Sequence, residues 1–270
     1  MSVITISRGT FSGGRDLAEC LARRLDYPCV SREVILDAAY EHGVPLEQLV
    51  AAIEKPPSLW QQLTGGRMAY LSFVRAALCE RAVGGNLVYH GHAGHLLLAG
   101  ISHVIRVRVI ADLEFRVRAA MERRHVDRKE AIAQIRKVDQ ERMRWTRFLY
   151  GVNWYDASLF DVVLNLGCMS VEDACDVVVR MTEMPRFKPT PESRKAAENL
   201  ALDNRVWAVL ASDPRTATAD VRVAANDGVV TITGSSLSRR AIEAIPQVAS
   251  QVRGVRQVHC LAEMGSVYAG

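Results

Sequence analysis

The stretch that decides the fold lies near the start of the chain and reads Ser7-Arg8-Gly9-Thr10-Phe11-Ser12-Gly13-Gly14-Arg15-Asp16-Leu17-Ala18. It follows the apolar run Val3–Ile6 and leads into apolar residues at helical spacing. A strand that runs into a glycine-rich turn and then into a helix is typical of a phosphate site, because backbone N–H groups and the helix N-terminus converge on an anion. We expect phosphate binding by Ser12, Gly13, Gly14 and Arg15, with a plain strand–turn–helix connection as the alternative.

The side chains of this loop add charge to the predicted site. Gly9 to Gly14, followed by Arg15 and Asp16, fits the pattern GxxxxGK[ST] with Arg in place of Lys and Asp in place of Ser or Thr. Arg15 can neutralise phosphate and donate two hydrogen bonds to it. Asp16 could hold Mg²⁺ through water, or merely offset the dipole of the helix that it begins. Gly13 is expected to let a phosphate approach the main chain closely, so that Gly13→Val should abolish nucleotide binding and leave the fold nearly intact.

Five short β-type runs alternate with helical patterns over the first part of the chain, which predicts an α/β domain of three layers with a five-stranded parallel sheet. The runs are residues 3–7, 28–31, 86–90, 104–110 and 161–165, and the helical patterns are residues 15–25, 67–83 and 113–123. Three prolines within residues 185–191 interrupt this order. We therefore predict a first domain over residues 1–184, a linker over 185–196 and a second domain over 197–265.

The second domain has a different pattern, in the order helix, hairpin, helix, strand. Asp227-Gly228 stands between two alternating runs, which predicts a hairpin over residues 221–233 because glycine adopts a positive φ without strain. Ser238 is a candidate cap for the next helix, and Gly254 ends it before a last strand over 255–261. The fold expected here is a small α+β domain.

Bulk properties place limits on the protein class. The chain has 270 residues, 49% hydrophobic and 24% charged, with six cysteines and no close CxxC pair. No apolar stretch approaches the roughly 18 residues of a membrane span, and we expect an unexported, cytoplasmic protein. The net charge is +4, but residues 106–147 hold thirteen Lys or Arg against seven Asp or Glu. This basic segment predicts a concentrated anion as its partner, with di- or triphosphates, RNA and acidic lipid as the candidates.

Three stretches together resemble the cytidylate-kinase-like family of P-loop nucleoside monophosphate kinases over residues 2–182. They are the loop itself, Ser31-Arg32-Glu33-Val34-Ile35, and the segment KVDQERMRWTRFLYGVNWYDASLFDVVLN at 137–165. The resemblance implies a nucleotide-binding phosphotransferase that uses ATP and Mg²⁺. Phe11 stands where the family usually has Gly, and Ser31 where it usually has Asp.

The resemblance also assigns expected site residues. Asp139 and Arg142 share a helix face and resemble the end of the family's lid motif, so Arg142, Asp139 and Arg15 are the expected catalytic residues. Arg116, Arg123 and Arg136 are expected to help hold the phosphates, together with Asp16. The alternative is a solvated basic helix face balanced by Glu130 and Glu141.

An acceptor nucleotide would bind at the carboxyl ends of the strands, and the expected contacts are Arg32, Glu33, Arg75 and His92. His92 stands where the family usually has an Arg after Gly. His90, His92 and His95 also offer imidazoles to zinc, but no Cys or carboxylate supplies an obvious fourth ligand, so we expect no metal site there.

The C-terminal phrases DGVVTITG at 227–234 and VRGVRQV at 252–258 resemble the BON domain over residues 197–264. This implies an accessory module for attachment to a membrane surface or a ligand; a packing or dimerisation domain is the alternative.

The leading hypothesis is a CMP-like kinase that the BON-like module localises or regulates. A nucleotide-sensing or scaffold protein without transfer activity is the second hypothesis. Nucleic acid is a poor third partner, because aromatic residues interleave with the basic ones only at Trp145, Phe148 and Tyr150.

Overall fold

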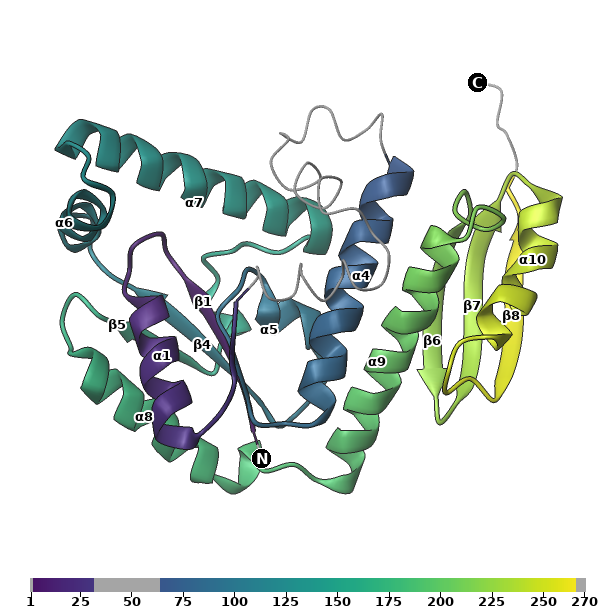
Figure 1. Ribbon diagram of the computed structural model, residues 1–270, viewed down its shortest axis with the longest axis horizontal. Coiled ribbons are helices and arrows are strands. Elements are labelled where there is room, and N and C mark those ends of the chain that lie inside the picture. The colour runs from purple at the N-terminus through teal and green to yellow at the C-terminus, as the bar shows by residue number, and fades with distance from the viewer. Residues whose placement is uncertain (1, 32–63, 266–270) are drawn as a thin grey trace. The chain divides into compact units, whose positions relative to one another are not determined.

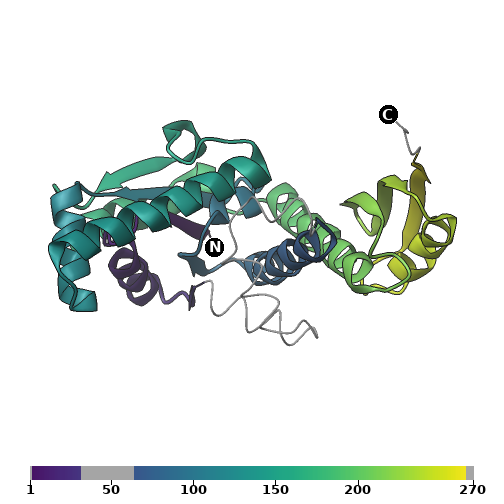
Figure 2. The same cartoon turned by 90° about the horizontal axis from the view of Figure 1, so that it is seen from above.

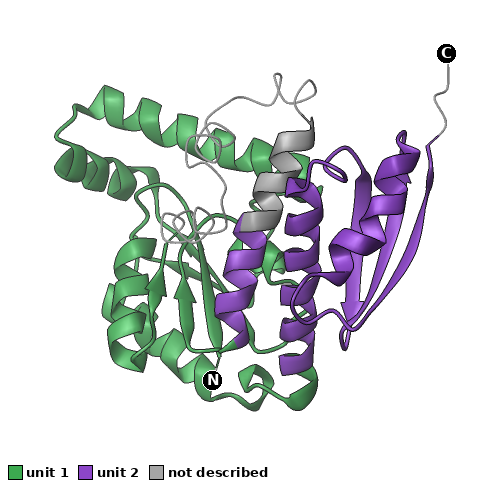
Figure 3. Ribbon diagram, turned by 45° about the vertical axis from the view of Figure 1, so that its right-hand side comes forward, with its two compact units in different colours: residues 1–34, 84–193 green, residues 35–83, 194–270 purple. Residues whose placement is uncertain are grey.

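The computed structural model describes residues 2–31 and 64–265, and describes no side chains for residues 64–73. Contacts group the chain into two compact units, which combine segments far apart in sequence (Figure 3). The first unit takes residues 1–34 and 84–193, and the second takes 35–83 and 194–270. The domain limits at 184 and 197 stay a prediction of the sequence.

The first unit is built on a five-stranded parallel sheet (Figure 1). Its strands run in the order β2-β3-β1-β4-β5, and β1 pairs with both β3 and β4. The strands are β1 (Val3–Arg8), β2 (Cys29–Val30), β3 (Leu87–Tyr89), β4 (Val104–Ile110) and β5 (Val162–Asn165). All five lie within or beside the predicted runs, so the predicted sheet is confirmed.

One face of this sheet carries the main hydrophobic core. Helices α1 (Gly14–Leu25) and α8 (Val171–Glu183) pack together there. Alternate residues of β1 and β4 point into this core, among them Ile4, Ile6 and Ile105, all at most 1% exposed. A capping box between Ser170 and Asp173 begins α8. This core fixes the start of α1 at the end of β1, because both elements are anchored in it.

The other helices of the first unit stand at the end of the sheet and on its second face. The short α5 (Gly94–Leu97) contacts β1. Helices α6 (Leu113–Arg124) and α7 (Arg128–Tyr150) form a hairpin beyond the carboxyl end of β1 (Figures 1 and 2). Asp112 and Asp127 cap these helices, and their side chains accept from the N–H groups of Phe115 and Glu130. After α7 come the short turns η2 (Ala157–Leu159) and, beyond α8, η3 (Pro185–Phe187).

The second unit contains α4 (Thr64–Val83), α9 (Pro191–Ser212), α10 (Arg239–Ser250) and a three-stranded sheet, β6-β7-β8. The hairpin joins β6 (Asp220–Asn226) to β7 (Val229–Ser236) through Asp227 and Gly228, both at positive φ. Ser238 caps α10, as predicted, and β8 (Gln257–Met264) lies parallel to β7. The predicted helix–hairpin–helix–strand order is confirmed.

In the part of the chain that the structure describes, no helix is long and apolar enough to cross a membrane.

Candidate functional site

The loop between β1 and α1 has the backbone form that a phosphate loop requires. Gly13 is the N-cap residue of α1 at φ +82°, and no side chain caps this end of the helix. The first N–H groups of a helix have no partner within it, so they point toward whatever lies at its N-terminus. A Cβ added to Gly13 would lie 2.8 Å from Leu166 Cδ1. Glycine is therefore needed by the loop itself, and the expectation that its replacement would spare the fold was wrong.

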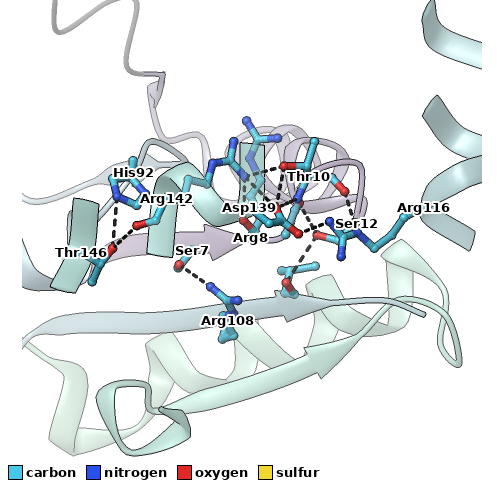
Figure 4. A network of polar contacts seen from close by, with 12 residues as sticks. Ser7, Arg8, Thr10, Ser12, His92, Arg108, Arg116, Asp139, Arg142 and Thr146 are labelled. Atoms are coloured by element: carbon cyan, nitrogen blue, oxygen red, sulfur yellow. Dashed lines mark hydrogen bonds and ion pairs between the residues drawn. The ribbon is translucent and has the colours of Figure 1, made fainter. Parts of the chain in front are cut away.

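A single carboxylate, that of Asp139, ties helix α7 to this loop (Figure 4). Its Oδ1 accepts from the Thr10 N–H at 3.0 Å and from the Thr10 hydroxyl at 2.7 Å. Its Oδ2 pairs with the guanidinium of Arg116, which also donates to the Thr10 carbonyl at 2.7 Å. Asp139 is 7% exposed. The sequence marked it for catalysis; in this structure it holds the loop and Arg116 in place.

Arg142, one helical turn further along α7, also reaches the loop. Its Nη1 donates to the Arg8 carbonyl at 3.1 Å and to Thr10 Oγ1 at 3.2 Å, and lies 4.0 Å from Asp139. The carbonyl of Arg142 accepts from the Thr146 hydroxyl at 2.8 Å, and this hydroxyl lies 3.3 Å from His92 Nε2. The structure thus brings together Arg142, Asp139, Arg116 and His92, which the sequence had marked separately.

The two charged residues at the start of α1 are engaged elsewhere. Arg15 pairs with Glu19 at 2.7 Å on the exposed side of α1. Both carboxylate oxygens of Asp16 accept from Arg123 of α6, at 2.8 and 2.7 Å. Arg136 is exposed on α7. Asp16 and Arg123 therefore join the helical hairpin to the loop through a second ion pair.

An apolar contact strengthens this attachment. Phe11, at φ 60°, packs against the cluster formed by Val117 and Ala120 of α6 and Ala131 and Ile135 of α7. Beside it lies a cavity of about 410 Å³, lined by Phe11, Gly13, Asp16, Phe115, Arg118, Ala119, Glu122 and Arg123. The departure from the family pattern at Phe11 thus has a structural role, because the ring anchors the α6–α7 hairpin.

A second group of residues lies beneath the loop, in which sequence reasoning missed Arg108 and Trp154 and considered His95 only as a zinc ligand. Arg108 of β4 is 5% exposed and donates to Ser7 Oγ at 3.0 Å, and its guanidinium lies 3.9 Å from the centre of the Trp154 ring. His95 of α5 is 3% exposed, and its ring centre lies 4.5 Å from that of Phe160. The one available signal was the alternation of β4 itself, Val-Ile-Arg-Val-Arg-Val-Ile, which is unusual for a central parallel strand.

The remaining expected contacts lie outside the described residues or in the second unit. Arg32 and Glu33 lie outside the described residues. Arg75 lies on α4, in the second unit, where its charge acts on Asp203; burial nevertheless raises the pKa of Asp203 to about 6. Within residues 2–31 and 64–265, no group of three or more His, Cys, Asp or Glu side chains is arranged to hold a metal ion.

Comparison with known proteins agrees with this geometry. Residues 3–167 match the cytidylate kinase-like family, and residues 194–265 match the BON domain. A cytidylate kinase of Ignicoccus hospitalis is 31% identical over 184 residues, which cover 67% of this chain and 99% of the relative. One from Staphylothermus marinus is 27% identical over 186 residues, 68% of this chain and 97% of the relative.

A solved structure has the same fold in this region. An uncharacterized protein from Eubacterium ventriosum has a TM-score of 0.52 and 20% identity, over 68% of this chain and 99% of the other. At this identity the likeness speaks for the fold alone.

Proposed function

The chain belongs to the cytidylate kinase-like family, and from that premise we propose that it transfers a phosphoryl group from ATP to a nucleoside monophosphate such as CMP. The observation that carries the proposal is the charge around the loop. Two cations, Arg116 and Arg142, contact the loop backbone. Among the described residues, one carboxylate, that of Asp139, bonds to Thr10 in the same loop. Such a surplus of cations at a helix N-terminus suits a phosphate chain.

Each loop residue has a proposed role in this reaction. The N–H groups at the start of α1 would receive the phosphates of ATP, with Gly13 and Gly14 allowing close approach. The Ser12 hydroxyl is buried and donates to the Gly9 carbonyl at 2.9 Å, so its role would be to hold the loop in shape. Arg142 and Arg116 both donate to carbonyl groups of the loop, and in the proposed reaction Arg142 would stabilise charge on the transferring group while Arg116 would hold the loop. Phosphoryl transfer asks little else of the protein than such positioning and electrostatic stabilisation.

The residues present also fit magnesium. Mg²⁺ keeps several waters and is usually bound by one or two carboxylates plus phosphate oxygens, so a cage of protein ligands is not required. Asp16, at the first turn of α1, would hold it through water once its ion pair with Arg123 opens. Bound there, the ion would supply positive charge that neutralises the phosphates.

Ligand binding must compete with contacts that the loop already makes. Arg123 would have to leave Asp16 for the phosphates, and Arg15 would have to leave Glu19. Both pairs are partly exposed and hence weak, worth about 1 kcal/mol or less each. The α6–α7 hairpin would thus rearrange at low cost while Phe11 and Asp139 keep it attached.

The same contacts support a second candidate, a nucleotide sensor without transfer activity. Arg15 and Asp16 stand where the pattern has Lys and Ser or Thr, and both are engaged in side-chain ion pairs.

For the C-terminal module we propose localisation at a membrane surface or regulation by a ligand, on its match to the BON domain. Cytoplasmic location is part of the proposal, and six free cysteines, three of them buried, suit a reducing compartment.

The test is a coupled assay of the full chain with ATP, Mg²⁺ and each common nucleoside monophosphate, with ATP affinity measured by calorimetry in parallel. Turnover with CMP is expected, and binding without turnover of any monophosphate would favour the sensor.

Arg142→Ala should lower kcat far more than ATP affinity, because its charge matters most as negative charge redistributes. Arg147→Ala, an exposed residue of the same helix, is the matched control and should change neither. Equal losses in kcat and ATP affinity would remove Arg142 from the transfer step.

A further inference from the structure

Arg108 is a buried cation on which the carboxylate of Asp139 acts only from beyond ion-pair distance, among the described residues. It is 5% exposed, and its hydrogen-bond partner is the hydroxyl of Ser7, at 3.0 Å (Figure 4). Among residues 2–31 and 64–265, no carboxylate lies within ion-pair distance of it. Burial lowers its pKa to about 10, which reflects the cost of keeping this charge away from water. The attraction to the Trp154 ring offsets only part of that cost.

Arg106 on the same strand shows what a compensated arginine looks like. It lies two residues earlier on the same face of β4, and it donates twice to the carboxylate of Asp161, at 3.0 and 2.8 Å. The two arginines on one strand face thus differ in two respects: Arg106 has a carboxylate partner and a side chain that is 36% exposed, whereas Arg108 has no carboxylate beside it and is 5% exposed. An arginine has five N–H donors, and Arg108 uses one of them on Ser7.

The neighbours of Arg108 also lack partners for buried polar atoms. Trp154 is 1% exposed, and its Nε1 has no hydrogen-bond partner in the described part of the chain. The same holds for both ring nitrogens of His95, which is 3% exposed. The three residues form one cluster: the Phe160 ring centre lies 4.5 Å from that of His95 and 5.7 Å from the Arg108 guanidinium, and this guanidinium lies 3.9 Å from the centre of the Trp154 ring. Buried polar groups without partners are rare in native proteins and call for an explanation.

We propose that Arg108, Trp154 and His95 form a binding site for a phosphate group, on the face of the sheet opposite α1. The guanidinium, the indole N–H and one imidazole N–H are all donors, so they match a ligand that only accepts. Ser7 and Arg108 are paired in register at the carboxyl end of β1, directly before the loop. Such a ligand is the phosphate of the acceptor nucleotide or free inorganic phosphate, and the inference rests on the proposed function only in naming the nucleotide.

Two measurements on the full chain test the site. Inorganic phosphate, CMP and cytidine are titrated, with affinity followed by calorimetry and the indole N–H signals by NMR. Trp154→Phe identifies the Trp154 signal. Phosphate or CMP should shift this signal, and cytidine, which lacks the phosphate, should not. A Trp154 signal that stays in place at saturating phosphate and CMP would overturn the proposal.

Arg108→Met separates binding from structure, because Met can still cover the Trp154 ring while the charge is removed. Its affinity for the anion that shifts Trp154 should fall roughly ten- to hundredfold, and its melting temperature should stay level or rise, since an uncompensated charge has left the interior. Arg106→Gln is the matched control, because its charge is already paired, and it should keep wild-type affinity. Unchanged affinity in Arg108→Met, or a fall in melting temperature with it, would make Arg108 a structural cation and overturn the site.

The ligands also separate this inference from the proposed function. Tighter binding of CMP than of inorganic phosphate, lost in Arg108→Met while ATP affinity is kept, assigns the site to the acceptor. Equal binding of both assigns it to free phosphate. If the protein binds phosphate at Arg108 but shows no turnover, the proposed kinase activity is overturned and the phosphate site stands. If the protein is active, and Arg108→Met changes neither the KM for CMP nor the affinity for phosphate, only the phosphate site is overturned.

Discussion

The two faces of the five-stranded sheet are built from the same strands but differ in chemistry. Toward α1 and α8, β1 and β4 present a continuous apolar core. Toward the other face, the same two strands present Thr5, Ser7, Arg106 and Arg108. Strands of buried parallel sheets are usually apolar on both faces, so polar alternation on a central strand needs a reason. The first face is an apolar core throughout, whereas the second combines buried apolar residues such as Val3 and Val104 with polar side chains near the phosphate loop.

The largest effect should come from the apolar face. Ile105 is 0% exposed near the start of β4, so Ile105→Ala removes buried methyl groups and leaves a cavity. We expect a loss of about 2–5 kcal/mol in the free energy of unfolding, measured by denaturant unfolding. Ligand affinity should change little in the folded protein. A loss below about 1 kcal/mol would mean that this face is not the main core.

The next effect belongs to His95 on the polar face. Burial, and then the charges of Arg108 and Arg106, lower its pKa to about 4, against about 6.5 in the unfolded chain. Below pH 6.5 the His95 imidazole is protonated in the unfolded chain, whereas in the folded protein it stays neutral until about pH 4. The free energy of unfolding should therefore decrease as the pH is lowered from 6.5 to 4, by up to on the order of 3 kcal/mol from this group.

His95→Gln removes this titration and serves as the comparison. The difference in unfolding free energy between the wild type and His95→Gln, measured at several pH values from 7 to 4, should change across the window in favour of the variant. A constant difference would show that the imidazole titrates alike in both states and that the polar face is less buried than its geometry indicates.

The smallest effect should come from the compensated pair on the polar face. Burial would raise the pKa of Asp161, but hydrogen bonds from the Arg106 side chain and N–H bring it below its usual value. Asp161→Asn keeps the shape and removes the charge, and Arg106 is partly open to solvent. We expect a loss of about 1 kcal/mol, measured by thermal unfolding at pH 7. A loss as large as that of Ile105→Ala would remove the distinction between the two faces.

Much of the architecture could be predicted because it is encoded locally. The runs ending at Ser7 and Ile110, the glycines of the loop and the Asp227-Gly228 hairpin each have a backbone preference that neighbouring residues do not override. Ser238 likewise caps α10 as its sequence position indicates. The stretch at 185–191 behaved differently. Its prolines start η3 and α9, and Phe187 is buried in the main core, so proline there marks helix starts as well as a boundary.

The site was predicted as a set of residues, not as a set of contacts. Sequence marked Asp139, Arg142 and Arg116 for phosphate chemistry but gave no sign that Asp139 would bond Thr10, 129 positions away. It also marked Phe11 as a departure from the family pattern and gave no sign that its ring packs against the α6–α7 hairpin. Contacts at such separations depend on how helices pack, which local preferences do not specify.

The sequence by itself determined where the strands, turns and helix caps form, because those follow from periodicity, glycine φ and capping groups within a few residues. Only the tertiary structure decided which charges are paired. Arg106 and Arg108 are the same residue type two positions apart on one strand, yet Asp161 lies beside the first and aromatic rings beside the second. That difference arises because the chain returns to β4 through residues 154–161, a long-range arrangement that fixes where carboxylate and indole meet the two guanidinium groups.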